Sequence, residues 1–210
     1  MRQVRILLWA ALLVAGLAVF ALYQLGARKH DGAAQTEYGS VPAFTFTDQR
    51  GQPLSNRDLA GRPWVANFVF TRCPSVCPLL TAKFKALQGK LADVPDAQFV
   101  SFSVDPVNDT PEVLAAYAQK YEADSTRWHF LTGPLADIER TIVAGFKVHV
   151  GDAKPSANDP SLVEIMHGEH LVLIDQRGVI RGYYRAEPAE LDQLASDLRG
   201  LAKERIALAR

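Results

Sequence analysis

The chain has 210 residues, and its 23 Lys and Arg residues balance its 23 Asp and Glu residues. This neutral composition, without a basic stripe along the sequence, excludes nucleic acid as a partner. An apolar stretch occupies the N-terminus, and the residues after it, about 180, are enough for one domain with a single core.

The N-terminal stretch is an unbroken apolar run from Ile6 to Tyr23, ILLWAALLVAGLAVFALY. A helix that crosses a bilayer needs roughly 20 apolar residues, whereas the apolar core of a cleavable signal has about 7–15. The length of the run therefore favours an uncleaved membrane anchor. A cleavage site at Val19-Phe20-Ala21 would instead release a secreted, soluble form, and this alternative stays open. No cysteine lies near the run, which argues against a lipid anchor.

The positive charges around the run favour, by a small margin, an N-terminus inside the cytoplasm, because Arg2, Arg5 and the terminal amine precede it while Arg28 and Lys29 follow it. We therefore expect a single-pass inner-membrane protein whose domain faces the periplasm, if the source is a Gram-negative bacterium. Small polar residues after the run are typical of a tether. The predicted organisation is an anchor over residues 1–25, a tether over 26–40 and one domain over 41–210.

Alternating and apolar runs predict the strands of this domain, and apolar residues at helical spacing predict its helices. The predicted strands cover residues 44–47, 64–70, 98–104, 170–174 and 179–184, with a further extended piece ending over 130–133. The predicted helices cover residues 79–91, a segment that starts at Pro111 after the N-cap Thr110, residues 134–146, and residue 188 to the end. The insertion over 151–165 is rich in Pro, Asp, Asn and Ser and is predicted to be an ordinary surface loop, with a partner-facing loop as the alternative.

The order of these elements is β-α-β-α followed by β-β-α. A strand–helix–strand crossover makes the first strands parallel, and the last two strands form an antiparallel hairpin. This is the layout of an α/β, thioredoxin-like fold, in which helices flank a central mixed sheet.

The two cysteines of the chain, Cys73 and Cys77, stand together in TRCPSVCP, residues 71–78. They follow a predicted central strand and precede the first long helix, so they lie at the carboxyl ends of the parallel strands, where ligands bind in such sheets. A loop that leads into a helix N-terminus, next to Arg72, favours the thiolate form of a cysteine.

A structural disulfide between these cysteines would close a very small loop and contribute only about 2 kcal/mol, for which a full-sized domain has little need. A thioredoxin-type oxidoreductase uses Cys-x-x-Cys, whereas three residues intervene here. That spacing gives two thiolates more freedom to converge on one ion, and soft thiolates suit Cu(I) and Zn(II). The residues alone therefore leave open a redox pair and a metal site, and a metal site would need a third ligand.

Four motifs, in order, resemble those of the SCO/SenC family. The segment FVFTRCPSVCPLLT is similar to the family's copper-site motif, and SVDPVNDTPEVLAAY is similar to its Ser-x-Asp-Pro-x-x-Asp-Thr-Pro signature. Trp128 with Leu131-Thr132-Gly133 resembles the family's Trp-x-x-Leu-Thr-Gly, and His167 in HGEHLVLID stands where the family carries its ligand histidine. The resemblance runs from residue 44 to about residue 195 and so covers the predicted domain.

The resemblance implies a thioredoxin-like domain that binds copper, as Cu(I) or Cu(II), through Cys73, Cys77 and His167. It also implies a metallochaperone that delivers copper to the binuclear copper site of cytochrome c oxidase. Its partners would be the copper-site subunit of the oxidase and a periplasmic copper donor. One departure is Met166-His167-Gly168, where the family commonly has Asp-His-Ser, so that a carboxylate is lost and a thioether is gained. Met166 is expected in a core, with a weak auxiliary contact to the metal as the alternative.

Other polar residues near these motifs have simpler explanations. His149 is the rival metal ligand, whereas His129 is predicted to be structural. His170 is three residues from His167 and would point to the opposite face of a continuous strand. Asp109 is expected to favour the start of a helix, and Asp105 is predicted either to cap a turn or to support or dock at the site.

The main alternative function uses the same thiols. A thiol–disulfide oxidoreductase would keep the copper-site cysteines of the oxidase reduced, with Cys73 and Cys77 as its redox-active pair. His167 discriminates between the two functions, because thiol exchange has no obvious need of it. We expect a copper chaperone rather than an enzyme. A sensor of copper or of redox state is compatible with the same residues, and a peroxidase would need a different motif around one cysteine.

Overall fold

The computed structural model divides the chain into two compact units, residues 1–35 and 36–210. It describes residues 9, 13–20, 36–73, 76–148, 150–155, 163–167 and 170–208. In the first unit, residues 13–20 are helical and carry exposed apolar side chains. The predicted anchor is therefore described only in part, and within the described residues we find no helix of the length and apolarity needed to cross a membrane.

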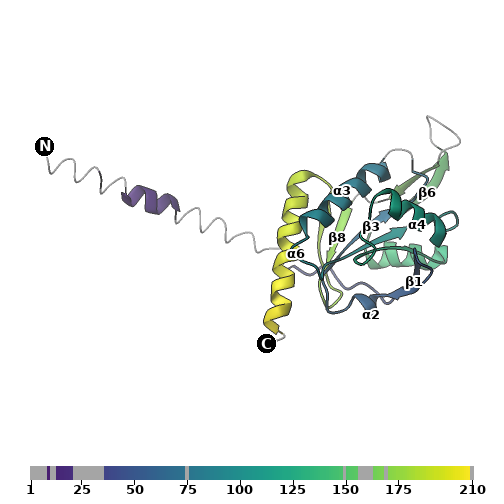
Figure 1. The fold of residues 1–210 in the computed structure, drawn as a ribbon, viewed down its shortest axis with the longest axis horizontal. Helices are drawn as coiled ribbons and strands as arrows, with labels where there is room; N and C mark the ends of the chain where they lie inside the picture. The colour runs from purple at the N-terminus through teal and green to yellow at the C-terminus, as the bar shows by residue number, and fades with distance from the viewer. Residues whose placement is uncertain are drawn as a thin grey trace. The chain divides into compact units, whose positions relative to one another are not determined.

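The second unit is built on a seven-stranded mixed sheet in the order β2-β1-β5-β4-β3-β8-β9 (Figure 1). Its strands are β1 (Thr45–Asp48), β2 (Pro53–Ser55), β3 (Trp64–Val69), β4 (Gln98–Ser103), β5 (Trp128–Thr132), β8 (His170–Ile174) and β9 (Ile180–Arg185). The central strands β3, β4 and β5 are parallel, and the outer strands pair antiparallel with their neighbours. The mixed sheet flanked by helices confirms the predicted fold class for this unit.

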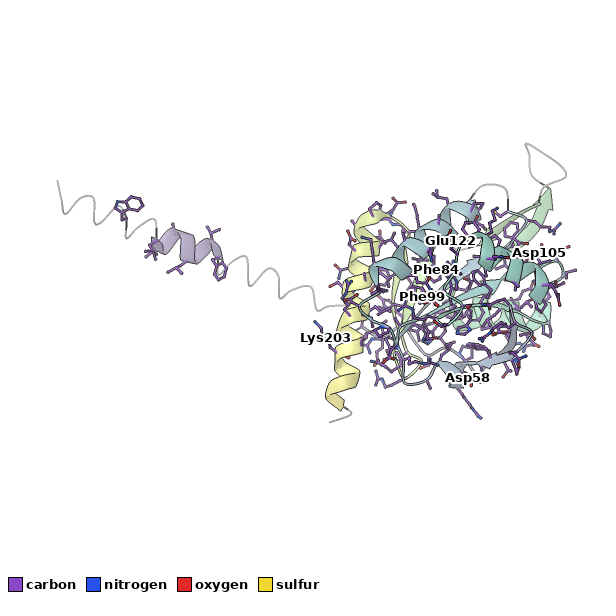
Figure 2. The ribbon with its side chains drawn as sticks, in the orientation of Figure 1. Asp58, Phe84, Phe99, Asp105, Glu122 and Lys203 are labelled. Atoms are coloured by element: carbon purple, nitrogen blue, oxygen red, sulfur yellow. The ribbon has the colours of Figure 1, made fainter. Side chains whose placement is uncertain are left out.

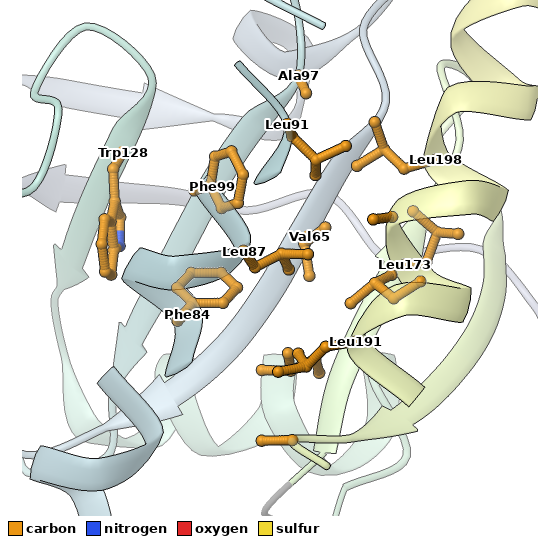
Figure 3. Close-up of a cluster of buried hydrophobic side chains, with 14 of the residues drawn as sticks. Val65, Phe84, Leu87, Leu91, Ala97, Phe99, Trp128, Leu173, Leu191 and Leu198 are labelled. Carbon is orange, nitrogen blue, oxygen red and sulfur yellow. The ribbon is translucent and has the colours of Figure 1, made fainter. Parts of the chain in front are cut away.

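Helices cover both faces of the sheet. The helices are α2 (Asn56–Leu59), α3 (Val76–Lys90), α4 (Pro111–Lys120), α5 (Leu135–Arg140), the π-helical segment η1 (Thr141–Gly145) and α6 (Pro188–Leu208). Helices α3, α4 and α6 pack on the face that carries Val65 and Phe99, as the close-up in Figure 3 shows for part of this cluster. Helix α5 and η1 pack on the opposite face, against Phe68 and Phe102. Both faces of the central strands are thus covered, which explains why β3, β4 and β5 are buried along their whole length.

Most element bounds agree with the predictions to within a few residues. The start of α4 is the clearest case, because Thr110 Oγ1 accepts a hydrogen bond from the backbone N–H of Val113 and Pro111 is the first helical residue. The edge hairpin of β8 and β9 turns over Asp175–Gly178 as expected. These elements carry local signals of capping, turn formation and alternation that do not depend on the rest of the fold.

The helix predicted over 134–146 is present, but its second half is a π-helix rather than an α-helix. Helix α5 ends at Arg140 and η1 continues it with a wider turn, in which Phe146 N–H donates to Thr141 O at 3.1 Å. The hydroxyl of Thr141 donates to the carbonyl of Asp137 at 2.8 Å, a side-chain bond of the kind that bends helices.

The insertion predicted as a loop is in part a hairpin. Strands β6 (Val150–Pro155) and β7 (Val163–His167) pair antiparallel and form a separate two-stranded sheet. The prediction missed them because β6 contains Gly, Asp and Pro, and neither strand alternates cleanly between apolar and polar residues. β7 ends at His167 and β8 begins at His170, the first residue of the predicted strand.

Candidate metal centre

The two cysteines lie where the central strand β3 passes into helix α3. The backbone N–H of Cys73 donates to the carbonyl of Phe70 at 3.3 Å, which turns the chain sharply after the strand. Cys77 is the second residue of α3, and its N–H donates to Cys73 Sγ at 3.3 Å. The Cys73 sulfur therefore accepts a hydrogen bond from one of the amide groups that a helix N-terminus leaves without an intrahelical partner. Pro78 follows within the first turn of α3, where a proline costs no hydrogen bond.

The two thiols differ in their surroundings, and no disulfide joins them. Cys77 is fully buried in the cluster that contains Phe68 and Phe102, whereas Cys73 is half-buried and packs against the edge of that cluster. Burial raises the pKa of the Cys77 thiol well above its usual range, against a hydrogen bond with the backbone of Phe70 that lowers it. Binding of a metal to Cys77 would therefore release a proton.

At Cys77 this corrects the expectation that the helix N-terminus and Arg72 favour a thiolate, because burial raises the pKa of that thiol. The guanidinium of Arg72 is already paired, because its Nε and Nη2 donate to Asp105 Oδ2 at 3.0 and 2.7 Å. Figure 2 shows Asp105 at the periphery of the domain, whereas Phe84 and Phe99 lie inside it. Asp105, in the turn after β4, thus holds Arg72, the residue before Cys73, and its role at the site stays a prediction.

Asp109 precedes the start of α4, as expected, and also has contacts that were not predicted. Thr110 is the cap of α4, while Asp109 is fully buried and accepts hydrogen bonds from Thr71 and Ser103. Burial raises the pKa of the Asp109 carboxyl, and the hydrogen bonds from Ser103 and Thr71 oppose this effect. A pattern of Asp followed by Thr-Pro predicts a helix start, and nothing local to it indicates contact with a loop 38 residues earlier.

The backbone of His167 ends strand β7, and its side chain lies outside what the structure describes. The register of β8 with β3 pairs Ala66 with Val172, so the start of β8 is level with the carboxyl end of β3. His167 precedes that start by three residues. A few residues after His167, the chain therefore enters the sheet at the end where β3 leads into the cysteine loop.

The remaining histidines differ in how far the structure describes them. His170 is exposed at the start of β8, and His129 is buried in β5, in agreement with the structural role predicted for it. His149 is outside the described residues, and Met166 lies in β7. Within the part of the chain that the structure describes, no three His, Cys, Asp or Glu side chains are grouped as a metal site.

The parallel core strands, the closing antiparallel hairpin and the paired thiols at the start of α3 define a thioredoxin-like domain with a two-cysteine site. A family model described as SCO1/SenC matches residues 32–203. The chain belongs to the SCO1/SenC family.

Individual relatives support this assignment. A Bacillus subtilis (strain 168) protein named SCO1 protein homolog is 35% identical over 190 residues, which are 89% of this chain and 94% of that protein. The solved structure of BsSco, titled as a member of the Sco family of cytochrome c oxidase assembly proteins with a disulfide switch, is 32% identical. Its TM-score is 0.69 over 80% of this chain and 96% of that chain. Bradyrhizobium japonicum ScoI, solved with copper bound, shares the fold at 23% identity and a TM-score of 0.66, over 77% of this chain and 99% of that chain.

Proposed function

We propose that this chain is a copper-binding metallochaperone in which Cys73, Cys77 and His167 hold one copper ion as cargo for the binuclear copper site of cytochrome c oxidase. The observation that carries the proposal is the bond of 3.3 Å from Cys77 N–H to Cys73 Sγ, which brings both sulfurs to one turn at the start of α3. Two thiolates with this freedom suit Cu(I), and an added imidazole also suits Cu(II).

The two thiols fit a cargo site rather than a permanent one. Cys77 is enclosed by the core and keeps one ligand fixed, while Cys73 is half-buried and remains accessible to a partner. His167 ends the β6–β7 hairpin, which is outside the main sheet, so the third ligand comes from an element that is separate from the rigid core. A receiving protein could then displace the outer ligands in turn while Cys77 still holds the ion.

The part of the proposal that concerns the oxidase is supported by BsSco, which is described as a member of a family of cytochrome c oxidase assembly proteins. The part that concerns copper is supported by the relative solved with copper bound. The apolar run over residues 6–23 would hold the domain beside a membrane-embedded oxidase, facing the periplasm, where a copper donor would load it.

Copper binding by the reduced full chain in detergent tests the proposal. We expect one copper per chain and a thiolate-to-Cu(II) absorption band that is lost or shifted in His167→Ala. The matched controls His149→Ala and His170→Ala remove the histidines on either side and should leave the band unchanged. Binding that does not depend on His167 would contradict the three-ligand site, and loss of the band in His149→Ala would move the third ligand to that residue.

The difference in burial between the thiols also favours a second candidate, a thiol–disulfide oxidoreductase. The accessible Cys73 sulfur would attack a partner disulfide, and Cys77 would then resolve the mixed disulfide. The partner would leave as a dithiol, and the Cys73–Cys77 disulfide that remains would need a thiol reductant to reset it. This candidate predicts reduction of an oxidised copper-site peptide at the same rate by wild type and His167→Ala, whereas a chaperone would show no such turnover.

A further inference from the structure

Asp109 is a fully buried carboxylate that is not among the proposed ligands. Within the described residues it has no ion pair with a basic side chain, so hydrogen bonds alone offset the cost of burying its charge. The hydroxyls of Thr71 and Ser103 each donate to it at 2.6 Å, and the backbone N–H of Thr71 donates at 3.2 and 3.3 Å to its two oxygens.

These bonds join three separate segments at the edge of the site. Thr71 lies two residues before Cys73 in the loop after β3, Ser103 is the last residue of β4, and Asp109 precedes the cap of α4. The hydroxyl of Ser103 also accepts the N–H of Asp105, and Asp105 binds Arg72. The two residues before Cys73 are therefore each held by a carboxylate from the turn after β4: Thr71 by Asp109 and Arg72 by Asp105.

A second buried carboxylate, Asp175, shows how such a group can stabilise the fold without any contact to the described residues of the cysteine loop. Asp175, in the turn between β8 and β9, is also a buried carboxylate that accepts backbone N–H groups, from Arg177 and Val179. Asp175 is paired with the guanidinium groups of Arg177 and Arg181. It lies at the end of the sheet where β3 begins, far along the strand from the cysteines, since Ile174 pairs with Trp64.

We propose that Asp109 is a positioning residue of the copper site. Asp109 binds Thr71 on one side and Ser103, the last residue of β4, on the other, and so links the loop that contains Cys73 to the end of β4. This link sets the position of the Cys73 sulfur relative to the buried sulfur of Cys77. The inference rests on the proposed function. It adds that the geometry of the two thiols is determined by a carboxylate on the neighbouring strand connection rather than by the cysteine loop alone.

The test compares two substitutions at one position. Thr71→Val removes the hydroxyl that donates to Asp109, and Thr71→Ser keeps it. In the copper-loaded full chain, we expect Thr71→Val to lose copper to a chelator about tenfold faster than wild type, as befits loss of a hydrogen bond to a charged group. We also expect a shifted thiolate-to-Cu(II) band. Thr71→Ser should restore both, and Asp109→Asn should shift the band in the same direction as Thr71→Val.

Two further measurements make the outcome decisive. Asp175→Asn applies the same carboxylate-to-amide change at the other end of the sheet, and it should lower the unfolding midpoint without changing the band or the release rate.

In the reduced, metal-free chain, Thr71→Val should also alter the rate at which iodoacetamide modifies Cys73, and Thr71→Ser should not. If wild type binds no copper, the proposed function fails, and the alkylation rates alone decide the role of Asp109. Equal behaviour of Thr71→Val and Thr71→Ser in both assays, or a copper effect in Asp175→Asn, would overturn the positioning role.

Discussion

Among single residues, the two cysteines are four positions apart and yet have opposite environments. Cys77 belongs to the core and Cys73 to its edge. Residue type and spacing predict that the pair carries the chemistry, because two thiols between a central strand and a helix have few structural uses. They do not predict which thiol is buried, since that depends on how the first turn of α3 is set against the sheet. For the same reason the contacts of Asp109 are not predicted, because its partners Thr71 and Ser103 come from other parts of the sheet.

His129 offers a prediction that is independent of copper. Its Nδ1 is 3.9 Å from Asp48 Oδ2 and has no hydrogen-bond partner within the described residues. Burial, together with the charges of Arg50 and Arg62, lowers the pKa of His129, and only the charge of Asp48 raises it. The folded state therefore favours the neutral imidazole, so its contribution to stability is present above the unfolded pKa of about 6.5 and is lost as the pH falls below it.

We expect the urea midpoint of wild type to fall more steeply between about pH 7 and about pH 5 than that of His129→Asn, which does not titrate there. Urea unfolding of both proteins across this range, in the metal-free state, measures the difference. Parallel curves would mean that His129 keeps an ordinary pKa in the folded protein.

At the level of helices and strands, the elements that were predicted well are those whose limits are encoded locally. Strand β8 begins and ends at the predicted residues, because HLVLI is an apolar run that stops at a turn sequence. The wider turn of η1 was missed, because it is associated with contacts distant in sequence. The β6–β7 hairpin was missed, because its residues show no clean alternation and its register is irregular. Gly145 is the example in η1, since a Cβ added there would lie 2.5 Å from Pro42 Cδ and 2.8 Å from its Cγ.

Gly145→Ala is therefore expected to destabilise the domain by about 1–3 kcal/mol, because neither the η1 backbone nor the Pro42 ring can move freely. The matched control is Gly89→Ala in α3, where an added Cβ meets no atom within 4 Å. That change should instead stabilise the protein by up to about 1 kcal/mol through helix propensity. Urea unfolding of the two variants measures both signs, and a neutral Gly145→Ala would show that Pro42 yields to η1.

At the scale of the whole molecule, the apolar run over residues 6–23 is expected to decide where the mature protein is found. If residues 6–23 form an uncleaved anchor, the mature protein should keep its full mass and remain in the membrane fraction after washes with high salt and alkaline carbonate. Placing Arg at Leu13 and Val14, in the middle of the run, should weaken insertion by several kcal/mol and release the protein from the membrane. A mature chain shortened near Ala21 and recovered in the soluble fraction would instead support the signal-peptide alternative.

The cluster that encloses Cys77 draws its members from β3, β4, η1 and also from β8, through Val172 and Ile174. A chain emerges from synthesis N-terminus first, so both cysteines exist before the β8 members of this cluster have been made. Until β8 takes its place beside β3, the cluster around Cys77 is incomplete. An unfinished chain in an oxidising compartment would then expose the inner thiol to cross-linking, from which burial shields it in the finished domain.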